Sequence, residues 1–223
     1  MTKPIKYAVS DLNGTLIDAM PTYTRVFSGI LKKRKGLPEE EVSEFSIRSA
    51  GTPWDEQFSA VLKRYGQPQD EVPEMMNEFC ELVNNERYSL YPKAEELLKS
   101  FKEKGWKVFI TSGSATGPVI RRIYEMGIFS YIDFVLGFDI YKKGPKHLEM
   151  LAEKEGLPMP EFAEQAIYFG DGPGDMILAK SCGLYTVGVA QTLEEKFLLQ
   201  AGADKVIAKI GDALETDWEK ARL

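Results

Sequence analysis

Apolar and polar positions divide the chain into two regions of different texture. In residues 1–17 and again after Tyr91-Pro92, short apolar runs occur together with segments whose apolar side chains recur at helical spacing. The expected strands are residues 5–10, 107–110, 134–136, 166–169, 185–189 and 205–207. The expected helices are residues 93–104, 118–126, 147–155, 175–181 and 212–221. This alternation predicts an α/β fold with a parallel, doubly wound sheet.

Glycine residues follow four of the predicted helices. They are Gly105, Gly127, Gly156 and Gly183. Helices commonly end at a residue in the left-handed conformation, which glycine adopts at little cost. The glycines therefore support the predicted helix ends.

Residues 18–87 have a different pattern, because no run typical of a strand interrupts them. Helical spacing appears instead in residues 22–35, 53–65 and 71–85. Gly36-Leu37-Pro38 and Gly66-Gln67-Pro68 separate these segments. We therefore expect an all-helical cap at residues 18–87, inserted into one core that consists of residues 1–17 and 88–223.

Four apolar runs lead into polar clusters. The clusters are Asp11-Leu12-Asn13-Gly14-Thr15, Thr111-Ser112-Gly113, Lys142-Lys143-Gly144-Pro145 and Gly170-Asp171-Gly172-Pro173-Gly174-Asp175. Ligands of parallel α/β sheets bind beyond the carboxyl ends of the strands. We therefore expect these clusters to converge on one pocket. Its carboxylates, hydroxyls and lysine suit a metal ion and a phosphoryl group.

The acidic residues of these clusters have two interpretations each. Asp11 can accept a phosphoryl group to form an acyl phosphate, or it can simply shape the turn before Asn13 and Gly14. Asp171 and Asp175 suit Mg²⁺, which takes one or two carboxylates together with water and substrate phosphate. Alternatively, Asp175 caps the helix that follows it.

The remaining two clusters contain hydrogen-bond donors and cations. Ser112 and the amides around Gly113 can donate hydrogen bonds to phosphoryl oxygens near a helix start, and Thr111 replaces Ser112 in this role if the strand ends one residue earlier. One lysine among Lys142, Lys143 and Lys146 is expected to supply a fixed positive charge to Asp11 and the phosphate.

Composition narrows the choice of partner and chemistry. The chain has 223 residues and a formal net charge of −6, which argues against nucleic acid or an anionic membrane as the main partner. Two cysteines and the single histidine His147 argue against a disulfide scaffold, a zinc site and a Ser-His-Asp triad. No stretch approaches the ~20 apolar residues of a membrane span, and no secretory segment precedes the first strand. We expect a cytoplasmic monomer or homodimer that binds a small phosphorylated metabolite.

The four clusters resemble the motifs of the haloacid dehalogenase superfamily, in the branch with a helical cap after the first motif. The family's DxDGT motif is matched by residues 11–15 except at Asn13, and its GDxxxD motif is matched in full by residues 170–175. The serine or threonine of the second motif falls on Ser112. The lysine of the third motif, commonly KPxP, falls on Lys142, because Pro145 lies three residues later, with Lys143 as the alternative.

This resemblance, to phosphoglycolate phosphatases and β-phosphoglucomutases in particular, implies a Rossmann-like core and an aspartyl-phosphate mechanism. Asp11, Asn13, Ser112 and Lys142 would be the catalytic residues. Mg²⁺ would be held by Asp11, the main-chain carbonyl of Asn13, Asp171 and Asp175, the last directly or through water. The substrate would contact Gly14, Thr15, Gly113, Lys143 and Arg48.

Arg48 belongs to the segment 48–53, which occupies the place of the family's specificity loop in the cap. A guanidinium there could bind a second anionic group of the substrate in bidentate geometry. The alternative is a surface arginine near a helix end. Trp54, which follows this segment, is more typical of packing.

Asn13 is the one departure from the first motif. In phosphatases of this family an aspartic acid at this position protonates the leaving oxygen and then deprotonates the attacking water. Asparagine keeps the main-chain carbonyl but cannot exchange a proton at neutral pH. General acid–base catalysis typically contributes ~10²–10⁴-fold, so we expect slow turnover with intact binding.

Three explanations of Asn13 are open. It is an engineered substitution that quiets an active phosphatase, or a natural residue in an enzyme whose leaving group needs little protonation, or the mark of a non-catalytic phosphate-ligand binding or regulatory protein. The sequence favours a Mg²⁺-dependent phosphatase impaired at Asn13. A phosphomutase or a phosphonatase is the alternative enzyme, whereas a dehalogenase is disfavoured because both Asp171 and Asp175 are present.

Overall fold

A single parallel sheet forms the centre of the molecule. The computed structural model describes residues 3–221, in which the strands have the order β3-β2-β1-β4-β5-β6 and every neighbouring pair is parallel. The strands are β1 (Tyr7–Ser10), β2 (Lys107–Thr111), β3 (Phe134–Leu136), β4 (Ala166–Gly170), β5 (Tyr185–Val189) and β6 (Lys205–Ile207). The strand order reverses between β1 and β4. This is where open α/β sheets bind their ligands.

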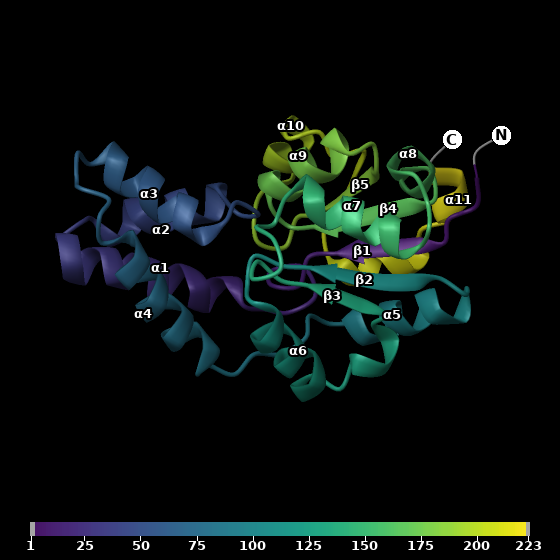
Figure 1. The fold of residues 1–223 in the computed structure, drawn as a ribbon, viewed down its shortest axis with the longest axis horizontal. Helices are drawn as coiled ribbons and strands as arrows, with labels where there is room; N and C mark the ends of the chain where they lie inside the picture. The colour runs from purple at the N-terminus through teal and green to yellow at the C-terminus, as the bar shows by residue number, and fades with distance from the viewer. Residues whose placement is uncertain (1–2, 222–223) are drawn as a thin grey trace.

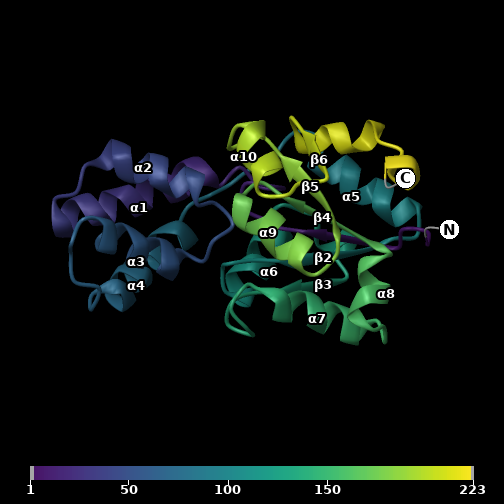
Figure 2. The ribbon, with the colours of Figure 1, turned by 90° about the horizontal axis from the view of Figure 1, so that it is seen from above.

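Helices cover both faces of the sheet (Figures 1 and 2). One face carries α5 (Ala94–Glu103), α6 (Thr116–Glu125), the 3₁₀ helix η2 (Ile210–Glu215) and α11 (Trp218–Ala221). The other carries α7 (Pro145–Lys154), α8 (Met159–Ala163), α9 (Pro173–Ser181) and α10 (Glu195–Gln200). A further 3₁₀ turn, η1 (Phe129–Tyr131), precedes β3. The predicted doubly wound α/β architecture is therefore confirmed.

Alternate residues of the strands pack into separate clusters on the two faces. In β1, Ala8 belongs to the cluster that includes α5 and α6, whereas Tyr7 and Val9 belong to the cluster with α7 and α9. Side chains of a strand alternate between the faces of a sheet. Because both faces are buried, the strands are apolar throughout, as the sequence pattern indicated.

A group of helices lies beyond the carboxyl ends of the strands (Figures 1 and 2). It consists of α1 (Met20–Lys35), α2 (Glu39–Arg48), α3 (Trp54–Arg64) and α4 (Val72–Asn84), and we call it the cap. Its helices fall within the predicted insert at residues 18–87. No helix in residues 3–221 has the length and the apolar character needed to cross a bilayer.

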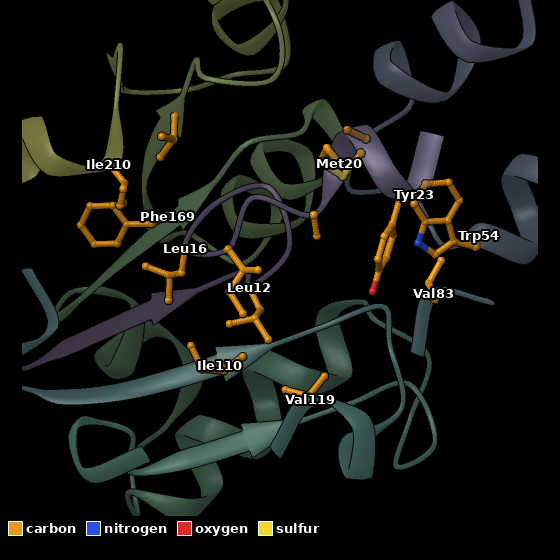
Figure 3. Close-up of a cluster of buried hydrophobic side chains, with 14 of the residues drawn as sticks. Leu12, Leu16, Met20, Tyr23, Trp54, Val83, Ile110, Val119, Phe169 and Ile210 are labelled. Atoms are coloured by element: carbon orange, nitrogen blue, oxygen red, sulfur yellow. The ribbon is translucent and has the colours of Figure 1, made fainter. Parts of the chain in front are cut away.

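Buried apolar side chains connect the cap to the sheet. Leu12 and Leu16, from the loop after β1, belong to the same cluster as Tyr23 and Trp54 of the cap (Figure 3). Leu12 and Leu16 are at most 1% exposed. Fully burying one such side chain contributes roughly 1.5–3 kcal/mol. The cluster therefore stabilises the first polar segment between the cap and the sheet.

Candidate active site

Three of the four polar clusters meet at one cavity between the sheet and the cap. The cavity has a volume of about 40 Å³. The core contributes Asp11, Asn13, Gly113, Ser114, Lys143 and Asp171 to its wall. The cap contributes Met20, Tyr23, Ala50, Gly51, Thr52, Trp54 and Gln57. A ligand in this cavity would therefore contact both parts of the chain.

Asp11 follows β1 directly, and its carboxylate is paired with a buried lysine. The Lys143 ammonium donates hydrogen bonds to Asp11 Oδ1 and to Asp175 Oδ1, each at 2.6 Å, and the lysine side chain is 4% exposed. Burial raises the pKa of Asp11 to about 6, although Lys143 opposes this rise. Burial alone would lower the pKa of Lys143, but its attraction to Asp11 and Asp175 raises that pKa well above the ordinary value. Lys143 is therefore a permanent cation beside Asp11.

Asp171 follows β4 and lines the same cavity. Its Oδ1 accepts a hydrogen bond from the Thr15 hydroxyl at 3.1 Å, and its Oδ2 accepts one from the Thr192 hydroxyl at 2.7 Å. Burial, followed by repulsion from Asp11 and Asp175, raises the pKa of Asp171 to about 8. The cavity thus contains more buried negative charge than Lys143 neutralises.

The loop after β1 brings Gly14 against Asp171. Three hydrogen bonds close this loop, from Leu16 N and Ile17 N to Leu12 O and from Gly14 N to Ile17 O. Gly14 has a φ of +93°, and a Cβ atom there would lie 2.2 Å from Asp171 Oδ2. The position therefore requires glycine both for its backbone conformation and for the space that the carboxylate occupies. Gly14 acts as a spacer rather than as a direct ligand donor.

Asp175 does not line the cavity. Its Oδ1 accepts hydrogen bonds from Lys143 and from the Tyr168 hydroxyl at 3.0 Å, and its Oδ2 accepts one from Gly172 N at 3.2 Å. The carboxylate therefore holds Lys143 and caps the start of α9, as the alternative interpretation of the sequence had it. The expectation that Asp175 coordinates the metal directly is not supported, because both oxygens are already engaged.

The carboxylates that remain fit a magnesium ion. Among residues 3–221, no set of three or more acidic, histidine or cysteine side chains is grouped to hold a metal ion by itself. Mg²⁺ needs only one or two carboxylates, because water and substrate phosphate supply its other ligands. Asp11 and Asp171 meet this need, and the raised pKa of each shows that the site lacks positive charge.

The predicted role of Lys142 is wrong in this structure. Its ammonium pairs with Asp55 Oδ2 at 3.0 Å and Glu56 Oε1 at 2.7 Å, and half of its side chain is exposed. It therefore connects the core to the first turn of α3, and Lys143 occupies the position beside Asp11. Lys146 pairs with acidic residues of its own helix, away from the cavity.

Arg48 also differs from its prediction. It ends α2, pairs with Glu44 at 2.5 Å on the same helix, and lies over the Phe197 ring at 5.4 Å. More than half of its side chain is exposed, and it does not line the cavity. The helix continues through Arg48, so the segment that reaches the cavity begins only at Ala50.

The second cluster contributes Gly113 and Ser114 rather than the Ser112 side chain. Ser112 is fully buried, and its hydroxyl accepts a hydrogen bond from Ser114 N at 3.1 Å, which shapes the loop after β2. Thr111 contacts the Tyr168 hydroxyl at 3.0 Å beneath the site. Ser112 therefore positions the backbone and the hydroxyl of Ser114, which the sequence did not identify.

Asn13 lies between Ser114 and a buried arginine that the sequence analysis also missed. Its Nδ2 is 3.4 Å from Ser114 Oγ, and its Oδ1 is 3.4 Å from Arg122 Nη1. The same Nη1 donates a hydrogen bond to the Tyr23 hydroxyl at 2.5 Å. Arg122 follows Arg121 on α6, and nothing in the spacing of the pair distinguishes the buried arginine from the exposed one.

The cap loop touches the loop after β4 through glycine. Gly174 N donates a hydrogen bond to Ala50 O at 3.2 Å. A Cβ atom on Gly172 would lie 2.2 Å from the Ala50 carbonyl, and one on Gly51 would lie 2.7 Å from Asp175 N. The absence of side chains at Gly51 and Gly172 therefore allows the two backbones to meet.

Comparisons with known proteins agree with this architecture. A family model described as haloacid dehalogenase-like hydrolase matches residues 5–183. A phosphoglycolate phosphatase of Vibrio cholerae is 27% identical over 226 residues, with 96% of this chain and 97% of the relative covered. A phosphoglycolate phosphatase of Rhodobacter capsulatus is 28% identical over 194 residues, covering 82% and 85%. The crystal structure of a hydrolase from Pseudomonas syringae has a TM-score of 0.83 at 19% identity, covering 96% and 98%.

Proposed function

Since the chain belongs to the haloacid dehalogenase-like hydrolase family, and is a phosphohydrolase of the phosphoglycolate phosphatase-like type, we propose that it hydrolyses a small phosphorylated metabolite with Mg²⁺ through a phosphorylated Asp11. The observation that carries this proposal is the cavity shared by Asp11, Lys143 and Asp171. A carboxylate nucleophile, a fixed cation and a second carboxylate are the groups that phosphoryl transfer to an aspartate needs.

The first step forms a bond from an Asp11 oxygen to phosphorus while the bond to the leaving oxygen breaks. Lys143 holds the Asp11 carboxylate at 2.6 Å and offsets the negative charge of the phosphoryl oxygens. The amides near Gly113 and the Ser114 hydroxyl donate hydrogen bonds to those oxygens. Asp11, Asp171 and the main-chain carbonyl of Asn13 would hold Mg²⁺, which supplies further positive charge to the phosphoryl group.

The second step releases phosphate. Water attacks the phosphorus of phospho-Asp11, the bond to the Asp11 oxygen breaks, and a proton leaves to solvent. The Asn13 amide cannot take that proton, so this step and the protonation of a poor leaving group are both slow. We expect turnover of alkyl phosphates to be reduced by about 10²–10⁴-fold compared with an enzyme that has a carboxylate at this position.

Phosphate release from a panel of phosphomonoesters tests the proposal, with Mg²⁺ and with EDTA. Asn13→Asp is expected to raise the rate on at least one alkyl phosphate by about 10²-fold or more, and Asp11→Asn in the same background is expected to abolish it. If Asn13→Asp hydrolyses no phosphomonoester when Mg²⁺ is present, the phosphatase assignment fails. In that case the second candidate, a protein that binds a phosphorylated ligand without turning it over, explains Asn13.

A further inference from the structure

Arg122 is a buried cation without a buried anionic partner. The residue is 2% exposed. Four hydrogen bonds of its guanidinium that the structure describes go to uncharged oxygens. The acceptors are the Tyr23 hydroxyl, Asn13 Oδ1, Val83 O and Asn84 Oδ1. Rings of Tyr23 and Tyr88 lie 5.6 and 4.9 Å from the guanidinium carbon.

The position of this cation is fixed from three sides. Arg122 belongs to α6 of the core, Tyr23 to α1 of the cap, and Val83 and Asn84 to the end of α4. Figure 3 shows Tyr23 beside Trp54, with its hydroxyl directed away from α1. Burying a guanidinium is costly unless its charge is compensated. The neutral partners of Arg122 satisfy its hydrogen bonds but leave its charge unopposed.

Arg122 acts on the cavity through two residues of the cavity wall. Asn13 and Tyr23 both line the cavity, and each accepts a hydrogen bond from Arg122 Nη1. Burial raises the pKa of the Tyr23 hydroxyl, so this group keeps its proton at neutral pH. It can accept from Arg122 and still donate to a negatively charged oxygen in the cavity. Arg122 is therefore a positioning residue for Asn13 and Tyr23.

Position 13 is where the family carries the acid for the leaving group, and the structure provides an arginine behind an amide there. A cation stabilises an oxygen that departs with its electron pair, but it cannot give that oxygen a proton. We propose that Asn13, Tyr23 and Arg122 form a leaving-group site for anions, so that the preferred substrates are acyl phosphates or phosphoanhydrides. This inference rests on the proposed phosphohydrolase function and narrows its substrate class.

The chemistry balances without an added acid. An Asp11 oxygen bonds to phosphorus, and the bond from phosphorus to the leaving oxygen breaks. The leaving group keeps that electron pair and departs as a carboxylate or a phosphate anion. Water then attacks phospho-Asp11, restores the Asp11 carboxylate and releases one proton to solvent. An alkyl phosphate would have to release an alkoxide by the same route, and it therefore reacts slowly.

The first experiment compares leaving groups in the full-length chain with Mg²⁺. We expect acetyl phosphate to be hydrolysed at least about 10²-fold faster than ethyl phosphate, the factor that a missing general acid costs. We expect Asn13→Asp to raise the rate on ethyl phosphate by a larger factor than the rate on acetyl phosphate. If the two substrates differ by less than tenfold in the unmodified chain, the inference is overturned while the phosphatase function stands. If all phosphates are inert to the unmodified chain and to Asn13→Asp, both fail.

The second experiment separates the charge of Arg122 from its packing. For a series of aryl phosphates, log(kcat/KM) is plotted against the pKa of the released phenol. A cation that stabilises the departing oxygen makes this slope shallower, so Arg122→Gln is expected to make it steeper, and Arg122→Lys is expected to restore part of the change. Tyr23→Phe, which removes the hydroxyl and keeps the ring, is expected to steepen the slope as well.

Arg121→Gln provides the matched control on the same helix. Arg121 is half exposed and contacts Asn84 O and Glu125 rather than a residue of the cavity wall. We expect its removal to leave the slope unchanged. If Arg122→Gln and Tyr23→Phe lower the rates on all aryl phosphates by one common factor, the two residues have only a structural role and the inference is overturned.

Discussion

At the scale of single residues, Lys143 determines the charge balance of the site. It donates a hydrogen bond to each of two buried carboxylates, and its neighbour Lys142 pairs with exposed acids of the cap. The sequence predicted that one lysine of this cluster faces Asp11, and this is confirmed. It could not select the residue, because the direction in which each side chain points depends on how the loop after β3 packs under the cap.

The paired lysines therefore give a matched test. Lys143→Met leaves Asp11 and Asp175 buried without their cation, and breaking a buried ion pair in this way costs about 3–5 kcal/mol. We expect the free energy of unfolding to fall by that amount and phosphatase activity to be lost. Chemical denaturation and phosphate release measure the two effects. Lys142→Met is expected to change the stability by less than about 1 kcal/mol, because its pairs are exposed. Equal losses in both variants would contradict this assignment.

Asp171 makes stability depend on pH. Its folded-state pKa of about 8 lies far above the value of about 3.9 of a free aspartate. Between these values the folded protein keeps a proton that the unfolded chain has released, so stability falls as the pH rises from about 4 to 8.

We expect the thermal midpoint in EDTA to decrease from pH 5 to pH 8. Asp171→Asn is expected to reduce that decrease, and Mg²⁺ is expected to oppose it by binding to the folded state. Thermal denaturation at several pH values measures all three effects. A midpoint in EDTA that rises over this range would contradict the placement of Asp171.

At the scale of elements, strands and helix ends were predictable, and several short helices were not. The glycines after the predicted helices have positive φ values of 69° to 81°, so their predicted conformation is confirmed. Helices α2, α8 and α10 were missed. Helix α2 begins with three glutamates and buries only Val42 and Ser46, so it lacks the apolar stripe by which helices are found. Tertiary contacts, rather than a sequence pattern, support such helices.

The loop after β1 can be tested at Gly14. Gly14→Ala places a methyl group against Asp171 and forces alanine into a left-handed conformation, and overpacking of this kind typically costs about 1–3 kcal/mol. We expect lower stability and weaker stabilisation by Mg²⁺, both measured by thermal denaturation. Gly29→Ala is the control, because Gly29 lies within α1 with open space around it and alanine favours helices. A Gly14→Ala variant as stable as the parent would contradict the close contact with Asp171.

At the scale of the whole molecule, the cap completes the cavity wall. The sequence predicted an inserted helical segment, but not which of its residues would face the core. Arg48 was expected there, and the structure places Ala50, Gly51 and Thr52 instead. These residues have no charge or motif to mark them. Their role depends on the contact with Gly172 and Gly174, which lie more than 100 positions later in the chain.

This contact predicts a variant that affects closure more than folding. Gly172 has a φ of −114°, which alanine adopts without strain, but a methyl group there would collide with the Ala50 carbonyl. We expect Gly172→Ala to hold the cap away from the core, with a larger radius of gyration by small-angle X-ray scattering, lower kcat and a nearly unchanged thermal midpoint. A variant with unaltered dimensions and kcat would show that the two loops need not meet.

The apolar cluster that runs from the sheet into the cap has a consequence for how this chain could be rearranged. A cap exchanged for that of another protein would carry the wrong partners for Leu12 and Leu16, which are buried against it on one side and against the sheet on the other. Chimeras that alter specificity therefore have to transplant the loop at residues 12–17 together with the helices. The catalytic aspartate and the lid that covers it form a single inherited unit.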